Sequence, residues 1–430
     1  MITRDQYLKK IISKQNNGLV KIITGIRRCG KSFLLFNIYR NYLIETGVNP
    51  NHIISIELDE IINQKYRNPN ELDKYIRESI INDGKVNYIF IDEIQNVKQV
   101  DNPYVEGDKI GFIDVLLGLM KIPNVDVYVT GSNSKMLSKD IATEFRGRGD
   151  EIRVHPLSFK EFYDAYEGDK HNAWNEYSLY GGMPFLSTLK THEEKRDYLK
   201  SLLDKVYITD IIERNKLKKD NVFVGELLDI LSSSIGSLVS QKKLSNTYKS
   251  ITNDSVSINT ISNYMSYYED AFLITKVQRY DIKGREYIDS PFKYYFEDIG
   301  LRNVRINFRQ NEPTYTMENI IYNELIIRGY SVDVGIVEVN YKDEDNKSKR
   351  KQYEIDFVCN KGDHKYYIQS AFVLENQAKI DQETRGLNRI KDSFKKIVIV
   401  KDCYIPWRDE NGILYIGLEY FLLNSNSLEI

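Results

Sequence analysis

The sequence predicts an α/β protein: a parallel sheet with helices on both faces, then a mostly helical region and a second α/β region. Three observations lead to this fold class. Short β-branched runs alternate with helical stretches over the first 165 residues, a pattern typical of a parallel sheet. The pattern turns mostly helical from about residue 166, and strands mix with helices again from about residue 301. A glycine-containing loop with phosphate-binding spacing follows the first predicted strand.

Length and composition indicate several domains and limit the kinds of partner. The chain has 430 residues, which at roughly 100–200 residues per domain corresponds to about two to four domains. Its 60 Lys and Arg residues nearly balance 62 Asp and Glu residues, so a nucleic-acid site would have to be a local patch. Three widely spaced cysteines indicate neither a disulfide framework nor a zinc cluster. A charged start and the lack of apolar runs near 18 residues favour a cytoplasmic protein with no membrane partner.

Four apolar runs are predicted as buried strands of the first sheet. They cover residues 20–25, 52–58, 87–92 and 125–131. Stretches with helical spacing lie between them, so consecutive strands should form parallel βαβ units. Ligands of such sheets bind outside the carboxyl ends of the strands. The segments that directly follow these strands are therefore the first places to search for a site.

The first motif has the pattern GxxxxGK[ST] and lies between a predicted strand and a predicted helix, as a phosphate-binding Walker A loop requires. Glycines let backbone N–H groups surround the phosphates, and the helix N-terminus adds positive potential. Lys31 is predicted to reach the β- and γ-phosphates, and the Ser32 hydroxyl is predicted to bind Mg²⁺. The loop residues are Gly25, Ile26, Arg27, Arg28, Cys29, Gly30, Lys31 and Ser32.

An acidic pair ends the strand predicted at 87–92. Asp92 should lie at the carboxyl end of the sheet beside the phosphate loop and complete the Mg²⁺ shell. Glu93 is then positioned to orient and deprotonate the attacking water. Many strands end in Asp or Glu, so the pair is weak by itself. After a complete phosphate loop it predicts nucleotide binding and hydrolysis.

Two further segments are candidates for contacts with the γ-phosphate. The strand at 125–131 continues into Ser132 and Asn133, and we assign the sensor role to Asn133, with Ser132 as the alternative. The other interpretation is a turn that caps the next helix. Arg148 follows a glycine and could reach the nucleotide of a neighbouring subunit in a homo-oligomer. A surface salt bridge is the alternative for this arginine.

Five segments together resemble a known family, the bacterial and archaeal AAA-type ATPases with a C-terminal domain of unknown function. The similarity in motif order covers essentially the whole chain and is most specific over residues 20–185. The resemblance implies that the nucleotide is ATP, and it matches Arg146 and Arg148 to an Arg-containing loop of the family. The segments are ITGIRRCGKSFLL, YIFIDEIQNV, VYVTGSNSKML, EFRGRGDEIRVHPLSFKEF and YGGMPFL.

Four domains are expected from the motif positions and this resemblance. Residues 1–165 should form an AAA-type P-loop ATPase core, and residues 166–220 a small helical lid. Residues 221–300 should form a winged-helix-like segment, and residues 301–430 a degenerate nuclease-like domain.

The winged-helix-like segment leaves its partner open. Its second helix is expected to be capped by Ser257 or Asn259, with Lys242, Lys243 and Lys249 nearby as phosphate contacts. That helix has no Arg, the commonest reader of guanine. Contact with DNA and contact with a protein partner therefore remain alternatives.

The C-terminal region resembles a PD-(D/E)XK nuclease in part. That chemistry needs an acid on a helix, an acid on a strand, and an acid-x-Lys sequence on the next strand. Glu318 and Asp356 supply the first two acids, but Gln369 and Ala371 stand where Glu and Lys are required. We therefore expect no nuclease activity. Glu318 and Asp356 would persist as structural hydrogen-bond partners or within a nucleic-acid surface that does not cut.

Two functions of different class are consistent with these residues. The first is an AAA-type ATPase that couples Mg²⁺-dependent ATP hydrolysis to movement of DNA- or protein-binding C-terminal modules. The alternative is a nucleotide-gated binding switch with little turnover, which recognises DNA or a protein partner. Turnover per subunit, and its stimulation by a partner, distinguishes the two functions.

Overall fold

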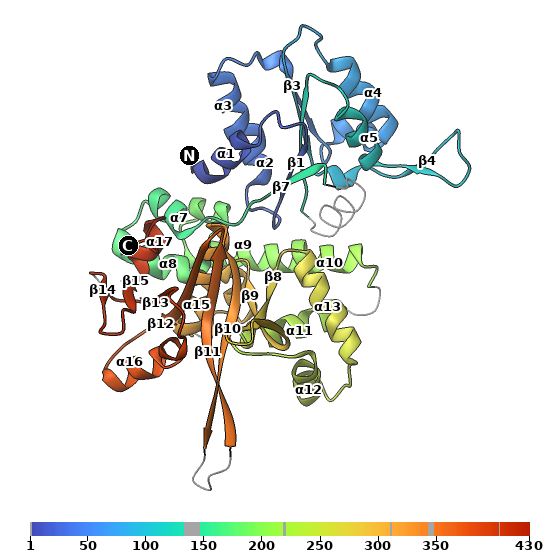
Figure 1. Ribbon diagram of the computed structural model, residues 1–430. Coiled ribbons are helices and arrows are strands. Elements are labelled where there is room, and N and C mark those ends of the chain that lie inside the picture. Colours follow the sequence, from blue (N-terminus) through green and yellow to red (C-terminus); the bar gives the residue numbers. More distant parts are fainter. Residues whose placement is uncertain (1, 133–146, 218–220, 310–311, 343–347, 404) are drawn as a thin grey trace. The chain divides into compact units, whose positions relative to one another are not determined.

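The chain divides into two compact units, each with its own sheet. Unit 1 contains Met1–Pro156 with Asp270–Phe272, and unit 2 contains Leu157–Glu269 with Leu273–Ile430. Figure 1 labels their helices and strands along the chain. The computed structural model describes residues 2–132, 147–217, 221–309, 312–342, 348–403 and 405–430.

Unit 1 contains a five-stranded parallel sheet, which confirms the predicted α/β core. Its order is β2-β3-β6-β1-β7, and all neighbouring strands are parallel. The four predicted strands are present, and β7 is a fifth strand whose charged, half-exposed sequence gave no strand signal. In this order, β6 lies between the phosphate-loop strand β1 and the acidic strand β3. The strands are β1 Val20–Thr24, β2 Ile53–Glu57, β3 Asn87–Asp92, β6 Val125–Thr130 and β7 Gly149–Arg153.

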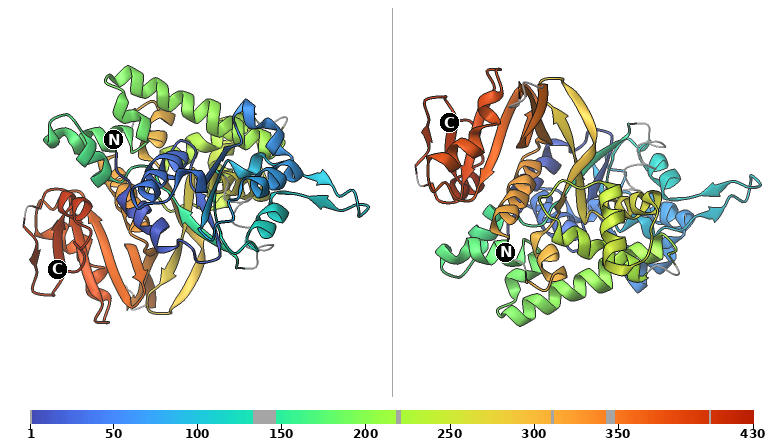
Figure 2. Two further views of the ribbon diagram at one scale, coloured as in Figure 1. Left: turned by 90° about the horizontal axis from the view of Figure 1, so that it is seen from above. Right: turned by 90° about the horizontal axis from the view of Figure 1, so that it is seen from below.

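Apolar side chains from the sheet and from α4 and α5 form one buried core cluster of unit 1. Helix α4 begins where the Asn68 side chain accepts a hydrogen bond from Asn70 N, with Pro69 in the first turn. A small hairpin, β4 Val100–Asp101 with β5 Lys109–Ile110, extends away from this unit in all three views (Figures 1 and 2). The helices are α1 Asp5–Ser13, α2 Lys31–Phe33, η1 Leu34–Tyr39, α3 Arg40–Glu45, η2 Pro50–His52, η3 Ile61–Arg67, α4 Pro69–Ser79, η4 Ile94–Asn96 and α5 Phe112–Leu119.

Unit 2 contains an eight-stranded mixed sheet of order β14-β15-β13-β12-β11-β10-β8-β9. Strand β8 pairs in parallel with β10, so the sheet continues across residue 300. The boundaries predicted at residues 165, 220 and 300 stay predictions. The strands are β8 Ile274–Asp281, β9 Glu286–Phe296, β10 Ser331–Lys342, β11 Ser348–Lys361, β12 His364–Ala371, β13 Lys395–Val400, β14 Trp407–Arg408 and β15 Leu414–Gly417.

The helices of unit 2 precede the sheet and alternate with its strands. Among the described helices of the whole chain, none is long and apolar enough to cross a membrane. Helix α15 packs on β9, β10, β11 and β12. The helices are α7 Phe159–Ala165, η6 Lys170–Asn172, α8 Ala173–Tyr180, η7 Pro184–Thr188, α9 His192–Ser201, η8 Leu202–Ile208, α10 Thr209–Arg214, α11 Asn221–Ser233, α12 Gln241–Thr252, α13 Ile258–Asp270, α14 Ile299–Arg305, α15 Pro313–Ile327, α16 Gln377–Thr384, η9 Leu387–Arg389 and α17 Leu418–Leu423.

A buried carboxyl group connects two distant segments of unit 2. Asp298 caps α14 by accepting hydrogen bonds from Gly300 N and Leu301 N at 2.9 and 3.2 Å, and it also accepts one from Gly182 N at 2.7 Å. Gly181 has φ +79°, and a Cβ there would lie 2.2 Å from an Asp298 oxygen. Burial raises the pKa of Asp298 to about 6. Gly181 of the YGGMPFL segment therefore allows the close approach of this carboxyl group.

Candidate functional site

The loop between β1 and α2 has the backbone geometry of a phosphate cradle. Arg28 and Gly30 have left-handed φ values of 65° and 97°, an arrangement that turns nearby backbone N–H groups toward one centre. Gly25 has φ +140°, and a Cβ at this position would lie 2.0 Å from Val154 O. Cys29 is buried, and its thiol donates to Val154 O at 3.3 Å. The nearby backbone of Val154 therefore requires glycine at position 25, while the Cys29 side chain packs into unit 1.

Lys31 is buried at the start of a continuous helical stretch that covers residues 31–45. Its Nζ donates to Gly25 O at 2.9 Å and to Ile26 O at 3.0 Å. Both acceptors are neutral carbonyl groups of the loop itself. Among the described residues, no carboxylate forms an ion pair with Lys31, so its positive charge is not neutralised within the loop.

Asp92 lies at the carboxyl end of β3 and accepts hydrogen bonds from two hydroxyl groups. Ser32 Oγ lies 2.9 and 2.8 Å from the two Asp92 carboxylate oxygens, and Thr130 Oγ1 also donates to Asp92. Asp92 is 3% exposed. Burial raises its pKa, while the hydrogen bonds from Thr130 and Ser32 oppose this effect. The predicted neighbours Ser32 and Asp92 are thus in direct contact.

Glu93 has φ 51°, in the left-handed region that few non-glycine residues adopt. Its backbone N donates to Thr130 Oγ1 at 3.0 Å. Its carboxylate accepts a hydrogen bond from Gln95 Nε2 and a longer one from Ser132 Oγ at 3.4 Å. Thr130 therefore positions both acids of the pair. The sequence placed Thr130 at the strand end, but it did not indicate this bridging role.

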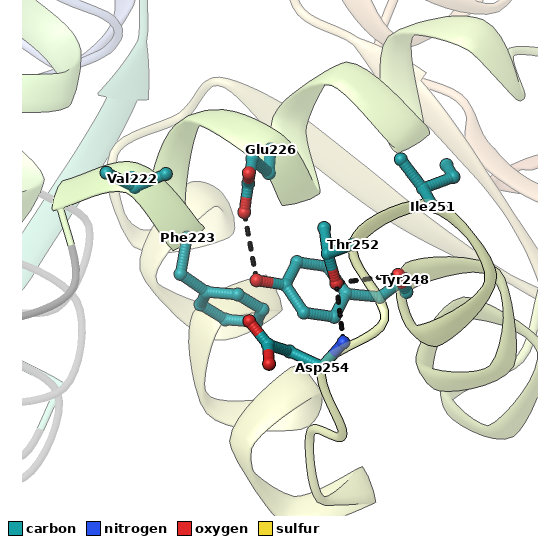
Figure 3. A pocket seen from close by; sticks show the side chains of 7 residues that line it. All are labelled: Val222, Phe223, Glu226, Tyr248, Ile251, Thr252 and Asp254. Carbon is teal, nitrogen blue, oxygen red and sulfur yellow. Dashed lines mark hydrogen bonds between the residues drawn. The ribbon is translucent and has the colours of Figure 1, made fainter.

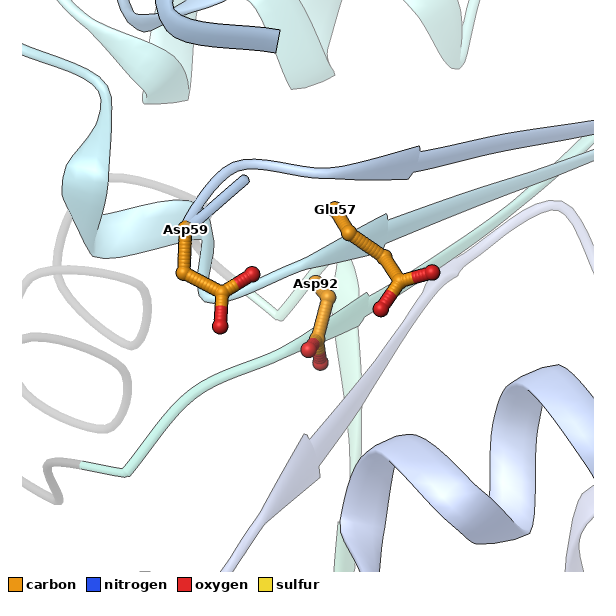
Figure 4. Close-up of side chains that lie close together, drawn as sticks. All are labelled: Glu57, Asp59 and Asp92. Carbon is orange, nitrogen blue, oxygen red and sulfur yellow. The ribbon is translucent and has the colours of Figure 1, made fainter. Parts of the chain in front are cut away.

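Two further carboxylates lie beside Asp92 at the end of β2. The carboxylate oxygens of Glu57, Asp59 and Asp92 lie within 4.8 Å of one another (Figure 4). Burial raises the pKa of Glu57, and Glu60, Asp92 and Asp59 add to this effect. Sequence reasoning missed Glu57 and Asp59. Their signal was available, because they end or follow a predicted strand at the edge that carries the phosphate loop.

The donor set at this edge fits a hard divalent cation. A serine hydroxyl and a carboxylate are oxygen ligands of the kind that Mg²⁺ takes, together with water and nucleotide phosphates. Ser32 Oγ and Asp92 already lie within 2.9 Å of each other. The backbone loop, a buried lysine and these oxygens are therefore suited to a nucleotide phosphate with its metal ion.

Of the predicted residues Asn133, Arg146 and Arg148, the structure describes Arg148. Asn133 and Arg146 lie outside the described residues. Arg148 is exposed directly before β7, and its carbonyl oxygen accepts a hydrogen bond from Val20 N at 3.2 Å. Val20 begins β1, whose five residues span roughly 16 Å at ~3.3 Å per residue. Arg148 thus lies at the edge of the sheet opposite to the phosphate loop of its own chain.

In unit 2, the lysines predicted to contact phosphate all lie on one helix. Lys242, Lys243 and Lys249 are exposed on α12. Ser257 Oγ accepts a hydrogen bond from Thr260 N at 3.0 Å at the start of α13, so Ser257 supplies the cap.

A cavity of about 440 Å³ lies beside these helices (Figure 3). Glu226 accepts a hydrogen bond from the Tyr248 hydroxyl at 2.9 Å within it, and Asp254 is a second carboxylate of the lining. The lining contains no Lys or Arg. Two carboxylates repel phosphate, so this part of the surface does not suit a nucleic-acid backbone. The lining residues are Val222, Phe223, Glu226, Tyr248, Ile251, Thr252 and Asp254.

Two nuclease-like residues of unit 2 share an ion-pair partner, a lysine that the sequence analysis did not identify. Lys293 on β9 forms ion pairs with Glu318 at 2.7 Å and with Asp356 at 3.5 Å. Gln369 faces Asp356 across the β11–β12 pair, since Phe357 is in register with Ile368. Ala371 is buried. A lone lysine within the apolar run SPFKYYF was the signal for Lys293.

Comparisons with known proteins agree with this geometry. Residues 17–163 match the model of an AAA domain, and residues 171–312 match a domain of unknown function, DUF8612. An uncharacterized protein of Haemophilus influenzae is 34% identical over 411 residues, which cover 94% of each chain. The uncharacterized protein MJ1544 of Methanocaldococcus jannaschii is 31% identical over 409 residues, which cover 91% of this chain and 82% of the relative.

Solved structures overlap less closely. The AMPPCP-bound DnaA of Aquifex aeolicus is 14% identical, with 61% of this chain and 86% of that chain covered and a TM-score of 0.29. A likeness of this size carries no argument about function. The AAA match, in contrast, spans the phosphate loop, the acidic pair and the strand that carries Thr130. The chain therefore belongs to the same family as the H. influenzae and M. jannaschii proteins, and its residues 17–163 match an AAA domain.

Proposed function

We propose that the protein is a Mg²⁺-dependent ATPase of the AAA type, whose hydrolysis drives movement of C-terminal modules that bind DNA or a protein. The observation that carries the proposal is the contact of Ser32 with Asp92 directly after a loop that holds Lys31 on neutral carbonyls. An anion would contact Lys31 there, and a hard cation would contact Ser32 and Asp92 beside it. ATP with Mg²⁺ combines the two charges in one ligand.

Each residue of the loop and strand ends has a distinct role in the proposal. Backbone N–H groups of residues 25–32 would bind the phosphates, and Lys31 would exchange its carbonyl acceptors for phosphate oxygens. Ser32 and Asp92 would hold Mg²⁺, directly and through water. When bound, Mg²⁺ supplies charge that neutralises the phosphate oxygens during transfer.

Glu93 would act as the general base. Its carboxylate accepts hydrogen bonds from Gln95 and Ser132, so it is held at the end of β3 next to Asp92. A carboxylate at this position would orient the attacking water and accept its proton. The left-handed φ of Glu93 supports such a role, since strained backbone is commonly retained at functional sites.

Two residues complete the proposal. Asn133 would sense the γ-phosphate, with Ser132 as the alternative. Arg148 would act on the nucleotide of a neighbouring subunit, and its exposure at the opposite edge of the sheet suits a role in trans better than a role in its own site. This part of the proposal requires a homo-oligomer.

Steady-state ATP hydrolysis tests the proposal. Wild type and Glu93→Gln are compared with and without duplex DNA, with Glu78→Gln as a control on the exposed side of α4. We expect Glu93→Gln to lose at least 100-fold in turnover while it still binds ATP, because the base is removed and the phosphate loop is retained. Glu78→Gln should turn over as the wild type does.

The outcomes separate the proposed ATPase from the switch. Stimulation by DNA assigns the partner to nucleic acid, and turnover indifferent to DNA assigns it to a protein. ATP binding without hydrolysis in the wild type would contradict the ATPase and favour the nucleotide-gated switch. Equal turnover in Glu93→Gln and wild type would remove Glu93 from the role of base.

A further inference from the structure

Unit 2 buries one ammonium group among three carboxylates. Lys293 Nζ lies 2.7 Å from Glu318 Oε1, 2.8 Å from Glu354 Oε1 and 3.5 Å from Asp356 Oδ1. The side chains of Lys293, Glu318 and Asp356 are 3%, 5% and 9% exposed. Glu354 is the partly exposed member at 32%. The carboxylates come from α15 and β11, and the lysine comes from β9.

Other groups fix the two deepest carboxylates. The Tyr295 hydroxyl donates to Glu318 Oε1 at 2.6 Å, and Ser370 N donates to Asp356 Oδ2 at 2.8 Å. Burial by itself would lower the pKa of Lys293, but its carboxylate neighbours outweigh burial and raise that pKa above its usual value. The lysine therefore remains a cation.

This arrangement has the pattern of a metal centre. Three carboxylates from two elements converge on one positive centre, and two of their oxygens lie at the usual length of a charge-assisted hydrogen bond from Nζ. A buried group of carboxylates needs a counter-charge, because removing several negative charges from water is costly. Lys293 supplies that charge from within the chain.

We propose that Lys293 is a tethered cation that occupies the position of a divalent metal ion in this centre. Unit 2 thus has a cation site that is already filled by its own side chain. The lysine is held by all three carboxylates, so it is not directed at a water molecule. Gln369 faces Asp356 from β12, and its amide donates to Glu383 at 3.4 Å.

The proposal predicts that removing the lysine opens the site to a metal ion. Lys293→Ala is compared with Lys276→Ala, a lysine on the neighbouring strand β8 that lies over the Phe292 ring. Thermal unfolding of the full chain is measured without nucleotide, with EDTA and with millimolar Ca²⁺. Hydrogen exchange of residues 313–327 assigns the transition to unit 2.

We expect Lys293→Ala to lower the midpoint of that transition by roughly 10 °C in EDTA, and Ca²⁺ to restore at least half of the loss. Wild type and Lys276→Ala should not respond to Ca²⁺ in this transition. The double variant Lys293→Ala/Asp356→Asn should lose the Ca²⁺ response, because it lacks one of the three carboxylates.

Three results would overturn the proposal. The first is a Ca²⁺-dependent rise in wild type that Asp356→Asn removes, since a metal ion would then bind beside Lys293. The second is a loss in Lys293→Ala no larger than that in Lys276→Ala. The third is a destabilised Lys293→Ala that Ca²⁺ does not rescue. If Lys293→Ala does not fold, Lys293→Met/Glu318→Gln replaces it, and the proposal fails if this neutralised pair is less stable than Lys293→Met alone.

Discussion

Lys31 in unit 1 and Lys293 in unit 2 are both buried, and they differ in what their ammonium groups contact. Lys31 donates to two carbonyl groups, whereas Lys293 forms ion pairs with three carboxylates. In the same way, Asp92 accepts hydrogen bonds from the neutral hydroxyls of Ser32 and Thr130. At the phosphate loop of unit 1, Lys31 and Asp92 are thus both held by neutral partners.

The two lysines differ in whether their positive charge is available to a ligand. A lysine held by carbonyl groups can still attract an anion strongly, because no opposite charge has neutralised it. A lysine surrounded by carboxylates has its charge compensated inside the unit, and its removal leaves uncompensated buried charges. The arrangement around Lys31 suits a ligand-binding site, and the arrangement around Lys293 suits a structural role inside unit 2.

Lys31→Met should separate function from stability. We expect ATP turnover to fall by about 1,000-fold or more, because the charge on the phosphates loses its main partner. Unit 1 should lose no more than about 1–2 kcal/mol, the cost of two hydrogen bonds to carbonyl groups. Lys293→Met should show the opposite pattern, with turnover within about threefold of wild type and a loss of about 3–5 kcal/mol in unit 2. Turnover and unfolding of both variants measure this, and similar losses of stability would break the comparison.

Asp298 is a buried carboxyl group whose described partners are backbone N–H groups. A bound proton can neutralise its negative charge, as Lys293 does for Glu318, Glu354 and Asp356. The pKa of Asp298 is about 6 when folded and lies near 3.8 when unfolded. The protonated form therefore favours the folded state, and the contribution of Asp298 is complete below about pH 4 and lost as the pH rises through 6.

About 2 kcal/mol of stability should be lost through this group between pH 4 and pH 6, since the full difference between the two pKa values corresponds to about 3 kcal/mol and the loss is still incomplete at pH 6. Asp298→Asn should remove that slope, because an amide is neutral at both pH values. Unfolding free energies of unit 2 across this range measure it, with Asp289→Asn as an exposed control in the same unit. Parallel curves for wild type and Asp298→Asn would show that Asp298 is already ionised at pH 4.

Thr130→Val tests the neutral partners of the acidic pair. The Thr130 hydroxyl donates to Asp92 and accepts from Glu93 N, so its loss should cost about 1–2 kcal/mol, or roughly tenfold in turnover. ATP affinity in EDTA should stay unchanged, while the Mg²⁺ concentration needed for half-maximal turnover rises. Thr46→Val, which removes a hydroxyl bonded to helix carbonyls, is the control. A loss of ATP affinity in EDTA would point to a general effect on the fold.

The smallest expected effect is none. Wild-type protein should not nick supercoiled plasmid DNA in Mg²⁺ or Mn²⁺, because Lys293 compensates the carboxylates that would hold a metal ion. Gel analysis of plasmid over several hours measures this. Nicking that Asp356→Ala abolishes would show that the centre is catalytic.

Local sequence patterns identified much of unit 1. The strand ranges at 87–92 and 125–131 differ from β3 and β6 by at most one residue, because strands buried on both faces read as continuous apolar runs. The phosphate loop and the acidic pair were recognisable because their function requires fixed residue types at fixed spacing. Strand β7 escaped because its partly exposed, charged sequence resembles a loop.

The contacts between distant residues needed the fold. Thr130 lies 38 positions from Asp92, and Lys293 lies 25 positions from Glu318 and 63 from Asp356, too far apart for sequence spacing to indicate a contact. Glu57 and Asp59 belong to the first site because β2 lies next to β3 in the sheet. Such proximity depends on strand order.

The α/β class of the first unit, the phosphate loop and the acids at the end of β3 depend on local backbone geometry and residue chemistry, so sequence patterns were enough to find them. Which of the buried charges are compensated depends instead on contacts between distant parts of the chain. Lys31 and Lys293 are the same residue type, and both are buried. The carbonyl groups around Lys31 and the carboxylates around Lys293 come together through chain folding, and Coulomb interactions over a few ångströms then give the two lysines opposite roles.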